Sequence, residues 1–182
     1  EACSVLMKSD SRGPGRDAIE RAHLKDPRDG SHVIYRYEPG PPLDGLVQRF
    51  WIPVWSVPAD REAPQKVLQY PVCLLVVSGE YARFYGVVSG LSTTTLSGDG
   101  WAVGAMCRPA AGFLIAGTPV SDFTDRFVDL TAVLGAVGGH LVDRVRAAMT
   151  PDPHSPDAHR AARDAFRDVL QPFLPVDAEG EL

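Results

Sequence analysis

Residues 72–88 read VCLLVVSGEYARFYGVV. Two runs of leucine, valine and aromatic residues flank a Ser-Gly-Glu sequence at residues 78–80. Runs of this kind around a glycine-containing turn predict a β-hairpin. Because side chains alternate between the two faces of a strand, Tyr81, Arg83 and Tyr85 are expected to share one face of the second strand.

Further strand-like runs lie on both sides of this hairpin. Residues 46–57 (LVQRFWIPVWSV) are rich in β-formers, and Pro53 within them favours an edge strand or a bulge because proline cannot donate to a strand ladder. Turn residues recur at close spacing between the runs, which is typical of a β-sandwich or a β-barrel. The other predicted strands are residues 32–37, 66–70, 92–96, 101–107 and 113–115.

After Leu130 the hydrophobic period changes from that of a strand to that of a helix. One stripe of the first predicted helix carries Val133, Leu134, Val137, Leu141, Val142 and Val145. Ser155 and Pro156 begin a second helix, with serine as the N-cap and proline at the first helical position. The expected fold class is therefore mainly β with C-terminal helices (α+β), a small β-barrel or sandwich followed by two amphipathic helices.

Each of these helices has an apolar face to bury. The faces offer a dimer interface, for which the candidate residues are Leu141, Val145, Phe166 and Leu170. The alternative is that the same faces pack on the core of their own domain. Periodicity alone does not distinguish the two.

The composition restricts the classes of function. The chain has 182 residues and a net charge of -5, whereas a surface that holds DNA phosphates is normally basic. No run approaches the ~20 apolar residues that span a bilayer, and residues 1–31, predicted to form a flexible N-terminal arm, lack the apolar core of a signal peptide. Three cysteines without a CxxC pair indicate reduced thiols and a cytoplasmic protein.

Motifs for nucleotide binding and nucleophilic catalysis do not occur in the sequence, which contains no GxxxxGK(S/T), GxGxxG or GxSxG. None of the five histidines is paired in an H-x-H or HExxH spacing, and a metal site needs several converging ligands. We therefore expect no metal, no cofactor and no enzyme activity. A zinc site built from His32, Cys73 and Cys107 is the alternative.

The candidate ligand-binding residues belong to the predicted strands. A small β-barrel can enclose one ligand between aromatic walls, and Trp51, Tyr81 and Tyr85 are the aromatic candidates. Cys107 and Arg108 join them at the end of an apolar run, where an arginine either anchors an acidic group through a two-pronged hydrogen bond or stabilises an internal turn. The alternative for the aromatic residues is that they fill the core.

A group of acidic residues, Asp122, Asp125 and Asp129, precedes the first predicted helix. Acidic side chains favour a following helix N-terminus. We expect them to cap turns and the helix, with cation binding as the alternative.

Several short motifs follow one another in a particular order. Tyr37-x-Pro39 and Leu43 come first, residues 47–51 (VQRFW) supply an aromatic-Trp pair, and residues 103–110 (VGAMCRPA) are the most specific stretch. The rest of the series is Pro71, Gly90, Gly117-x-Pro119, Asp122-x-Thr124-Asp125, Leu130, Leu134-Gly135 and Leu141-x-x-Arg144. In this order, over residues 37–170, the motifs resemble the domain that precedes the helix-turn-helix module in many AraC-type bacterial transcription regulators.

Two positions depart from that family's pattern. Val-Cys follows Pro71 where the family often has Asp-Gly, and Cys107 replaces the usual phenylalanine. At these two positions, a ligand-binding role from the family does not transfer directly to this chain.

The resemblance implies a cupin-like β-rich sensor domain at residues 32–130 and a helical dimerisation or linker segment at residues 131–175. A DNA-binding helix-turn-helix domain is expected after residue 182. The implied partners are an unknown small-molecule effector and a second copy of the chain, with DNA contacted only through that further domain. The alternative is a stand-alone cupin-like small-molecule-binding protein or enzyme.

Overall fold

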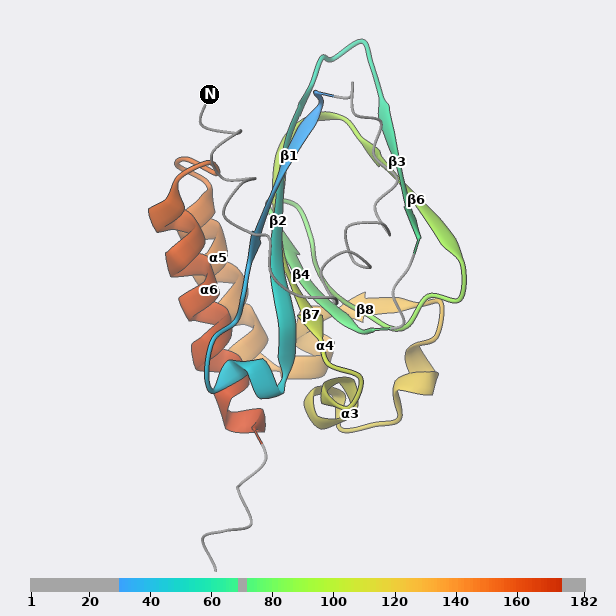
Figure 1. Cartoon of the computed structure of the whole chain (residues 1–182), viewed down its shortest axis with the longest axis vertical. Helices are drawn as coiled ribbons and strands as arrows, with labels where there is room; N and C mark the ends of the chain where they lie inside the picture. The colour runs from blue at the N-terminus through green and yellow to red at the C-terminus, as the bar shows by residue number, and fades with distance from the viewer. Residues whose placement is uncertain (1–29, 69–71, 175–182) are drawn as a thin grey trace, which may run out of the picture.

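The computed structural model describes residues 30–68 and 72–174, so the predicted N-terminal arm at residues 1–31 lies almost wholly outside the described residues. The predicted class is confirmed: a six-stranded antiparallel sheet in the order β1-β2-β7-β4-β5-β8 is followed by C-terminal helices. A second sheet contains only β3 and β6. Figure 1 shows β3 and β6 on the side of the large sheet opposite to α5 and α6.

The strands are β1 (His32–Tyr37), β2 (Val47–Val57), β3 (Ala63–Leu68), β4 (Leu74–Ser78), β5 (Ala82–Tyr85), β6 (Leu91–Leu96), β7 (Gly98–Cys107) and β8 (Phe127–Asp129). The described helices are η1 (Leu43–Gly45), α3 (Ala111–Ala116), η2 (Val120–Phe123), α4 (Leu130–Leu134), α5 (Ala136–Met149), α6 (Pro156–Leu170) and η3 (Gln171–Phe173).

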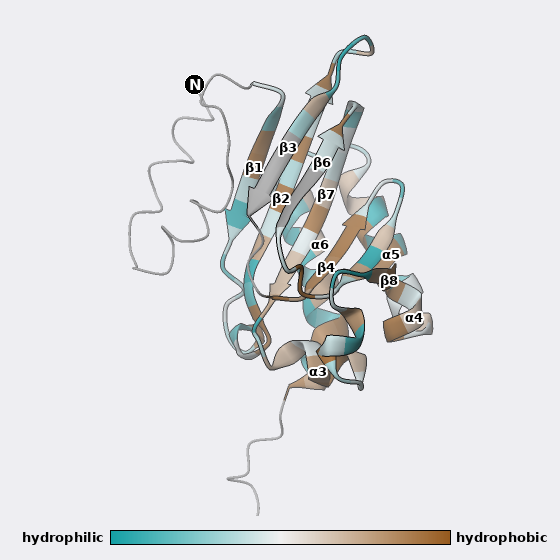
Figure 2. Ribbon diagram, turned by 90° about the vertical axis from the view of Figure 1, so that its right-hand side faces the viewer, coloured by the Kyte–Doolittle hydropathy of each residue, from teal (hydrophilic) through white to brown (hydrophobic). Residues whose placement is uncertain are grey.

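The two faces of the large sheet differ because successive side chains point to opposite sides. Phe50 on β2 pairs with Ala105 on β7, which in turn pairs with Leu75 on β4, so these fully buried residues share the face covered by α5 and α6. Phe50 meets Phe166 of α6 edge to face, with ring centroids 5.7 Å apart. Figure 2 shows that β4, in the interior of the sheet, is hydrophobic along most of its length.

The opposite face carries the other set of side chains. Trp51 on β2 lies directly opposite Gly104 on β7, and a side-chain carbon on Gly104 would come within 1.7 Å of the Trp51 ring. The indole can therefore lie flat on the β7 backbone only because residue 104 has no side chain. The two sheets are not joined by a strand ladder, and the finer assignment to a cupin-like barrel stays a proposal.

The helix pair is fixed to the sheet by polar contacts as well as by the core. Ser155 caps α6 by accepting a hydrogen bond from the Ala158 amide, with proline at the first helical position, as the sequence predicts. His159 is fully buried; its Nε2 donates to the Pro153 carbonyl oxygen at 2.7 Å, and its Nδ1 lies 2.7 Å from the Tyr37 hydroxyl. Because a carbonyl oxygen can only accept, the neutral ring carries its proton on Nε2 and accepts from Tyr37.

One predicted strand is wrong, and one strand is missed. Residues 113–115 belong to the helix α3, which ends at Gly117 in the left-handed conformation (φ 68°). A three-residue apolar run is too short for its period to distinguish a strand from a helix. The three-residue strand β8 was not predicted for the same reason.

Other boundaries also differ from the predictions. The predicted first helix is divided at Gly135 (φ 62°) into α4 and α5. The second strand of the predicted hairpin, residues 81–88, stops at Tyr85. The Phe123 carbonyl lies so close to the next residue, Gly86, that a side-chain carbon there would approach it to 2.0 Å.

Candidate functional site

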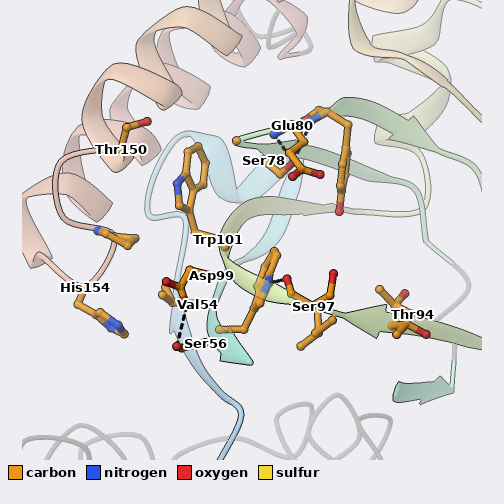
Figure 3. A pocket seen from close by; sticks show the side chains of 17 residues that line it. Val54, Ser56, Ser78, Glu80, Thr94, Ser97, Asp99, Trp101, Thr150 and His154 are labelled. Atoms are coloured by element: carbon orange, nitrogen blue, oxygen red, sulfur yellow. Dashed lines mark hydrogen bonds between the residues drawn. The ribbon is translucent and has the colours of Figure 1, made fainter. Parts of the chain in front are cut away.

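A cleft of about 640 Å³ lies where one end of the large sheet meets β6 and the loop between α5 and α6 (Figure 3). This volume falls within the range of small-molecule sites, roughly 300–1,000 Å³. Its lining comes from four segments that are distant in the sequence: Val54, Trp55 and Ser56; Ser78, Gly79, Glu80 and Tyr81; Thr94, Thr95, Leu96, Ser97, Asp99, Gly100 and Trp101; and Thr150, Pro153 and His154.

Trp55 and Trp101 both line the cleft, and they project from opposite faces of the large sheet, since Trp55 pairs with Gly100 and Trp101 with Val54. The Trp55 ring lies against Gly100, where a side-chain carbon would approach it to 2.3 Å, and its Nε1 donates to the Ser97 carbonyl oxygen at 3.4 Å. The Trp101 ring lies about 4.0 Å from the carbon that a side chain on Gly79 would add. Gly100 therefore allows the Trp55 indole to lie close to the backbone, whereas the Trp101 ring is at an ordinary van der Waals distance from residue 79.

The β4–β5 turn places Glu80 at the cleft. The Ser78 hydroxyl accepts hydrogen bonds from the amides of Glu80 at 3.2 Å and Tyr81 at 3.0 Å, which fixes the turn. The Ser78 carbonyl oxygen accepts from Nε of Arg146 on α5 at 3.0 Å. The turn is thus tied to the helix pair through its backbone.

A second carboxylate, that of Asp99, comes from the start of β7. It accepts a hydrogen bond from the Ser56 hydroxyl at 2.6 Å, across the β2–β7 pair. In Figure 3 Asp99 lies next to Val54 and Ser56 in the lower part of the view, and Glu80 lies next to Ser78 in the upper part. The cleft is therefore lined by two exposed carboxylates that come from different segments of the chain.

On the side of the helix pair, the cleft is lined by residues of the loop between α5 and α6. His154 Nδ1 lies 2.8 Å from the Tyr35 hydroxyl, and the His154 amide donates to the Asp152 carboxylate at 3.0 Å. Next to it, Pro153 accepts from buried His159. Burial, the largest cause, lowers the pKa of His159 below its usual value, so the ring is held in the neutral form that these hydrogen bonds require.

Of the predicted ligand-binding residues, the structure places only Tyr81 at the cleft. Burial, and then the neighbouring Tyr85, raise the pKa of Tyr81 to about 12, so its hydroxyl stays protonated at neutral pH. Trp51 packs on Gly104, on the face of the sheet away from the helices. Tyr85 lies beside Arg83, whose guanidinium is 3.3 Å from the Tyr85 hydroxyl.

The other two predicted residues are at the opposite end of β7. Arg108 is exposed and its Nε donates to the Asp44 carbonyl oxygen, as expected of an arginine that stabilises a turn. Cys107 is fully buried, and burial raises the pKa of its thiol. The Cys107 amide donates to the Cys73 carbonyl oxygen at 2.9 Å, and both are free thiols.

The predicted dimerisation residues fill the core of the protomer: Leu141, Val145, Phe166 and Leu170 are each 0% exposed. They correspond to the alternative in which the apolar faces pack on their own domain. The outward side of the helix pair is polar where Arg144 and Asp168 form a salt bridge of 2.8 Å. A dimer interface on these helices would have to use residues other than the four predicted.

Of the three acidic residues before the helices, Asp129 is a helix cap and Asp125 bonds to a distant loop. Asp129 caps α4 by accepting from the Thr131 amide at 2.8 Å, and Asp125 accepts from the Ser89 amide at 2.8 Å. Within residues 30–68 and 72–174, no three His, Cys, Asp or Glu side chains are grouped so that they could hold a metal ion. No helix in the described part of the chain is long and apolar enough to cross a membrane.

Several cleft residues are not among the predicted ligand-binding residues. Trp55 and Trp101 are detectable from the sequence, because both belong to the aromatic residues of the predicted strands, the group from which Trp51, Tyr81 and Tyr85 are taken as candidates. Glu80 and Asp99 carry no signal of this kind, since one lies in a turn and the other at a strand start where acidic residues are common. Only the strand order brings them to one cleft.

A family described as a domain of unknown function (DUF6597) matches residues 35–129. The matched region runs from β1 to the end of β8 and includes every cleft residue except those of the α5–α6 loop. No curated protein and no solved structure matches the chain.

Proposed function

This chain belongs to the family described as a domain of unknown function (DUF6597), and from that premise we propose that it is the effector-sensing domain of an AraC-type bacterial transcription regulator. In this proposal a small molecule binds the cleft, and DNA is bound by a separate helix-turn-helix domain. The protein works in the cytoplasm as a homodimer, and no catalytic residue is assigned.

One observation carries the proposal: the cleft is shared between the β strands and the loop that joins α5 to α6. A ligand there touches the β4–β5 turn at Glu80 and the helix pair at Thr150 and His154. A ligand alters a conformational equilibrium only if it binds two states differently. A ligand that contacts both the β4–β5 turn and the helix pair would bind two states differently whenever the turn and the helix pair shift relative to each other.

The net charge of the chain also supports the proposal that this chain binds the ligand and a separate domain binds DNA. A net charge of -5 disfavours direct contact with DNA phosphates. We therefore expect the chain alone not to bind duplex DNA at moderate salt. Submicromolar, salt-sensitive binding in a fluorescence anisotropy titration would contradict the proposal.

A thermal-shift screen tests the sensing function. A compound that binds only the folded protein raises the unfolding midpoint, by an amount equivalent to about 2.7 kcal/mol at a concentration of 100 Kd. Each compound that raises it is then tested on Asp99→Asn, with Asp60→Asn as the matched control, because Asp60 is exposed and does not line the cleft. A shift reduced in the first variant and kept in the second supports the cleft as the site.

A second experiment tests the regulator assignment. The gene is read downstream of residue 182 for a helix-turn-helix signature, which the proposal expects in the same reading frame. A stop codon at that point, together with ligand turnover by the purified protein, would favour the stand-alone alternative and refute the assignment.

A further inference from the structure

We propose that the outer side of α3 is the surface on which the domain that follows residue 182 docks. The inference depends on the proposed function, because the occupant is the helix-turn-helix domain of that proposal. It adds the place where the sensing domain and the DNA-binding domain touch, which neither the fold nor the family indicates.

The first argument is the composition of α3, which has no polar side. Residues 109–117 read PAAGFLIAG, and none of these nine residues has a polar side chain. A helix that is apolar on all sides is normally buried on all sides. Yet Phe113 is 54% exposed and Leu114 is 41% exposed. The protomer therefore leaves one apolar side of α3 in contact with water.

The other side of α3 is packed tightly on the protomer. Ala111 and Ile115 are buried in the core. Between them, a side-chain carbon on Gly112 would come within 2.8 Å of the Cys73 sulfur and within 2.7 Å of the Val120 side chain. The absence of a side chain at residue 112 thus allows the helix to lie directly on the core. This packing fixes which side of α3 faces outward.

The second argument is the position of α3 beside the end of the helix pair. Leu174, which follows η3, packs on η1, since its Cδ2 would lie 3.3 Å from a side-chain carbon on Gly45. Arg108 donates to the Asp44 carbonyl oxygen of the same short helix, and the Arg108 carbonyl oxygen accepts from the Ala111 amide at the start of α3 at 2.9 Å. Figures 1 and 2 both show α3 next to the end of the segment that follows α6.

The third argument is the short length of chain after Leu174. The eight residues 175–182 can span at most about 29 Å even when fully extended. A domain that begins after them is held near α3 at a high effective concentration, whereas a second copy of the chain has no such tether. In the described part of the chain, Phe113 and Leu114 are also the only exposed large apolar residues that are neighbours in the sequence. The observations therefore favour the following domain over a second copy.

Hydrogen–deuterium exchange tests the docking by comparing the whole gene product with the chain of residues 1–182 at the same low concentration. We expect the amides of residues 113–117 to exchange at least about tenfold more slowly in the whole protein, because a docked domain suppresses local opening of α3. Equal rates would overturn the inference. So would protection that appears in residues 1–182 alone and grows with protein concentration, because a second copy would then cover α3.

Matched variants of the whole protein test the two exposed side chains. Phe113→Ser combined with Leu114→Ser should return the exchange of residues 113–117 to the rate seen in residues 1–182. The control Phe127→Ser removes a ring of similar exposure, 51%, that contacts Arg83 and Tyr85 of β5, and it should leave the protection of α3 unchanged. Circular dichroism checks that each variant is folded. Protection that survives the double change, or that the control abolishes equally, would overturn the inference.

The outcome also separates this inference from the proposed function. If a helix-turn-helix domain follows residue 182 and α3 exchanges equally fast with and without it, the proposed function stands and the docking surface is wrong. If no such domain follows, both fail.

Discussion

The contact between Trp51 and Gly104 gives the sharpest prediction for stability. In Gly104→Ala the new methyl carbon would lie 1.7 Å from Cε3 and Cζ3 of Trp51. Carbon atoms in contact are separated by about 3.5–4.0 Å, so the ring has to move by roughly 2 Å. The ring belongs to a half-buried residue of the long strand β2, and a shift of this size means that it leaves its place.

The expected cost follows from overpacking. Inserting a methyl group into a packed site costs typically about 1–3 kcal/mol, and we expect about 3 kcal/mol here because the obstacle is a rigid indole. The free energy of unfolding should be measured by urea denaturation followed by far-ultraviolet circular dichroism, because tryptophan fluorescence would report the displaced ring itself. The matched control is Gly139→Ala in α5, where the new carbon meets nothing within 4 Å. That change should stabilise the protein by about 0.5–1 kcal/mol.

A double-mutant cycle assigns the cost to the clash. In a Trp51→Ala background, Gly104→Ala should cost much less, so that the coupling between the two positions is about 1–3 kcal/mol. A Gly104→Ala protein as stable as the wild type, or a cycle in which the two changes are additive, would refute the placement of the Trp51 ring on β7.

Three further predictions concern the helices and the thiols. Burial lowers the pKa of His159 below 6.5, so between pH 6.5 and this lowered pKa the unfolded chain binds more protons than the folded chain. The contribution of His159 to the free energy of unfolding should be fully present above about pH 6.5. It should fall as the pH drops from there to the lowered pKa, by at most about 1.4 kcal/mol per pH unit. His159→Gln should flatten this dependence in urea melts at pH 5 to 7.5, and an unchanged slope would contradict it. Burial raises the pKa of the Cys73 and Cys107 thiols, so both should react with a thiol reagent at pH 8 only upon unfolding; fast labelling of either one in the native protein, located by mass spectrometry, would argue against their burial. Ser155→Ala should destabilise the protein by about 1 kcal/mol through loss of the α6 cap, whereas Ser155→Gly should cost only a few tenths, and equal losses would count against the cap.

The parts of the fold that were predictable have strong local signals. The turn at residues 78–80 and the alternating side chains around it predicted the hairpin of β4 and β5. Ser155-Pro156 predicted the start of α6 to within one residue. Both depend on side chains that act on their own neighbours. By contrast, α3 and β8 are short, and tertiary contacts decide their conformation.

The faces of the helices show a different limit. The periodicity around Leu141 and Phe166 established that a stripe is buried, and the structure shows that the protomer's own sheet covers it. A period reports that a face is apolar and not what covers it. The partner of an amphipathic helix can be identified only from the packed fold.

The cleft could be predicted least. Ser56 and Asp99 are separated by more than forty positions in the sequence and meet through the β2–β7 pairing, which a single sequence does not reveal. Arg108, by contrast, looked functional because a charged residue ended an apolar run, yet it bonds to a backbone carbonyl in a turn. The residue that is unusual in the sequence therefore does not lie at the cleft.

Hydrogen–deuterium exchange with and without a compound selected by the thermal-shift screen is the most direct test of the sensing cleft. We predict slower amide exchange at residues 78–81 and at residues 150–154 together, because one ligand in the cleft would contact both segments. Protection confined to one of the two segments, or located away from both, would contradict a cleft that joins the strands to the helix pair.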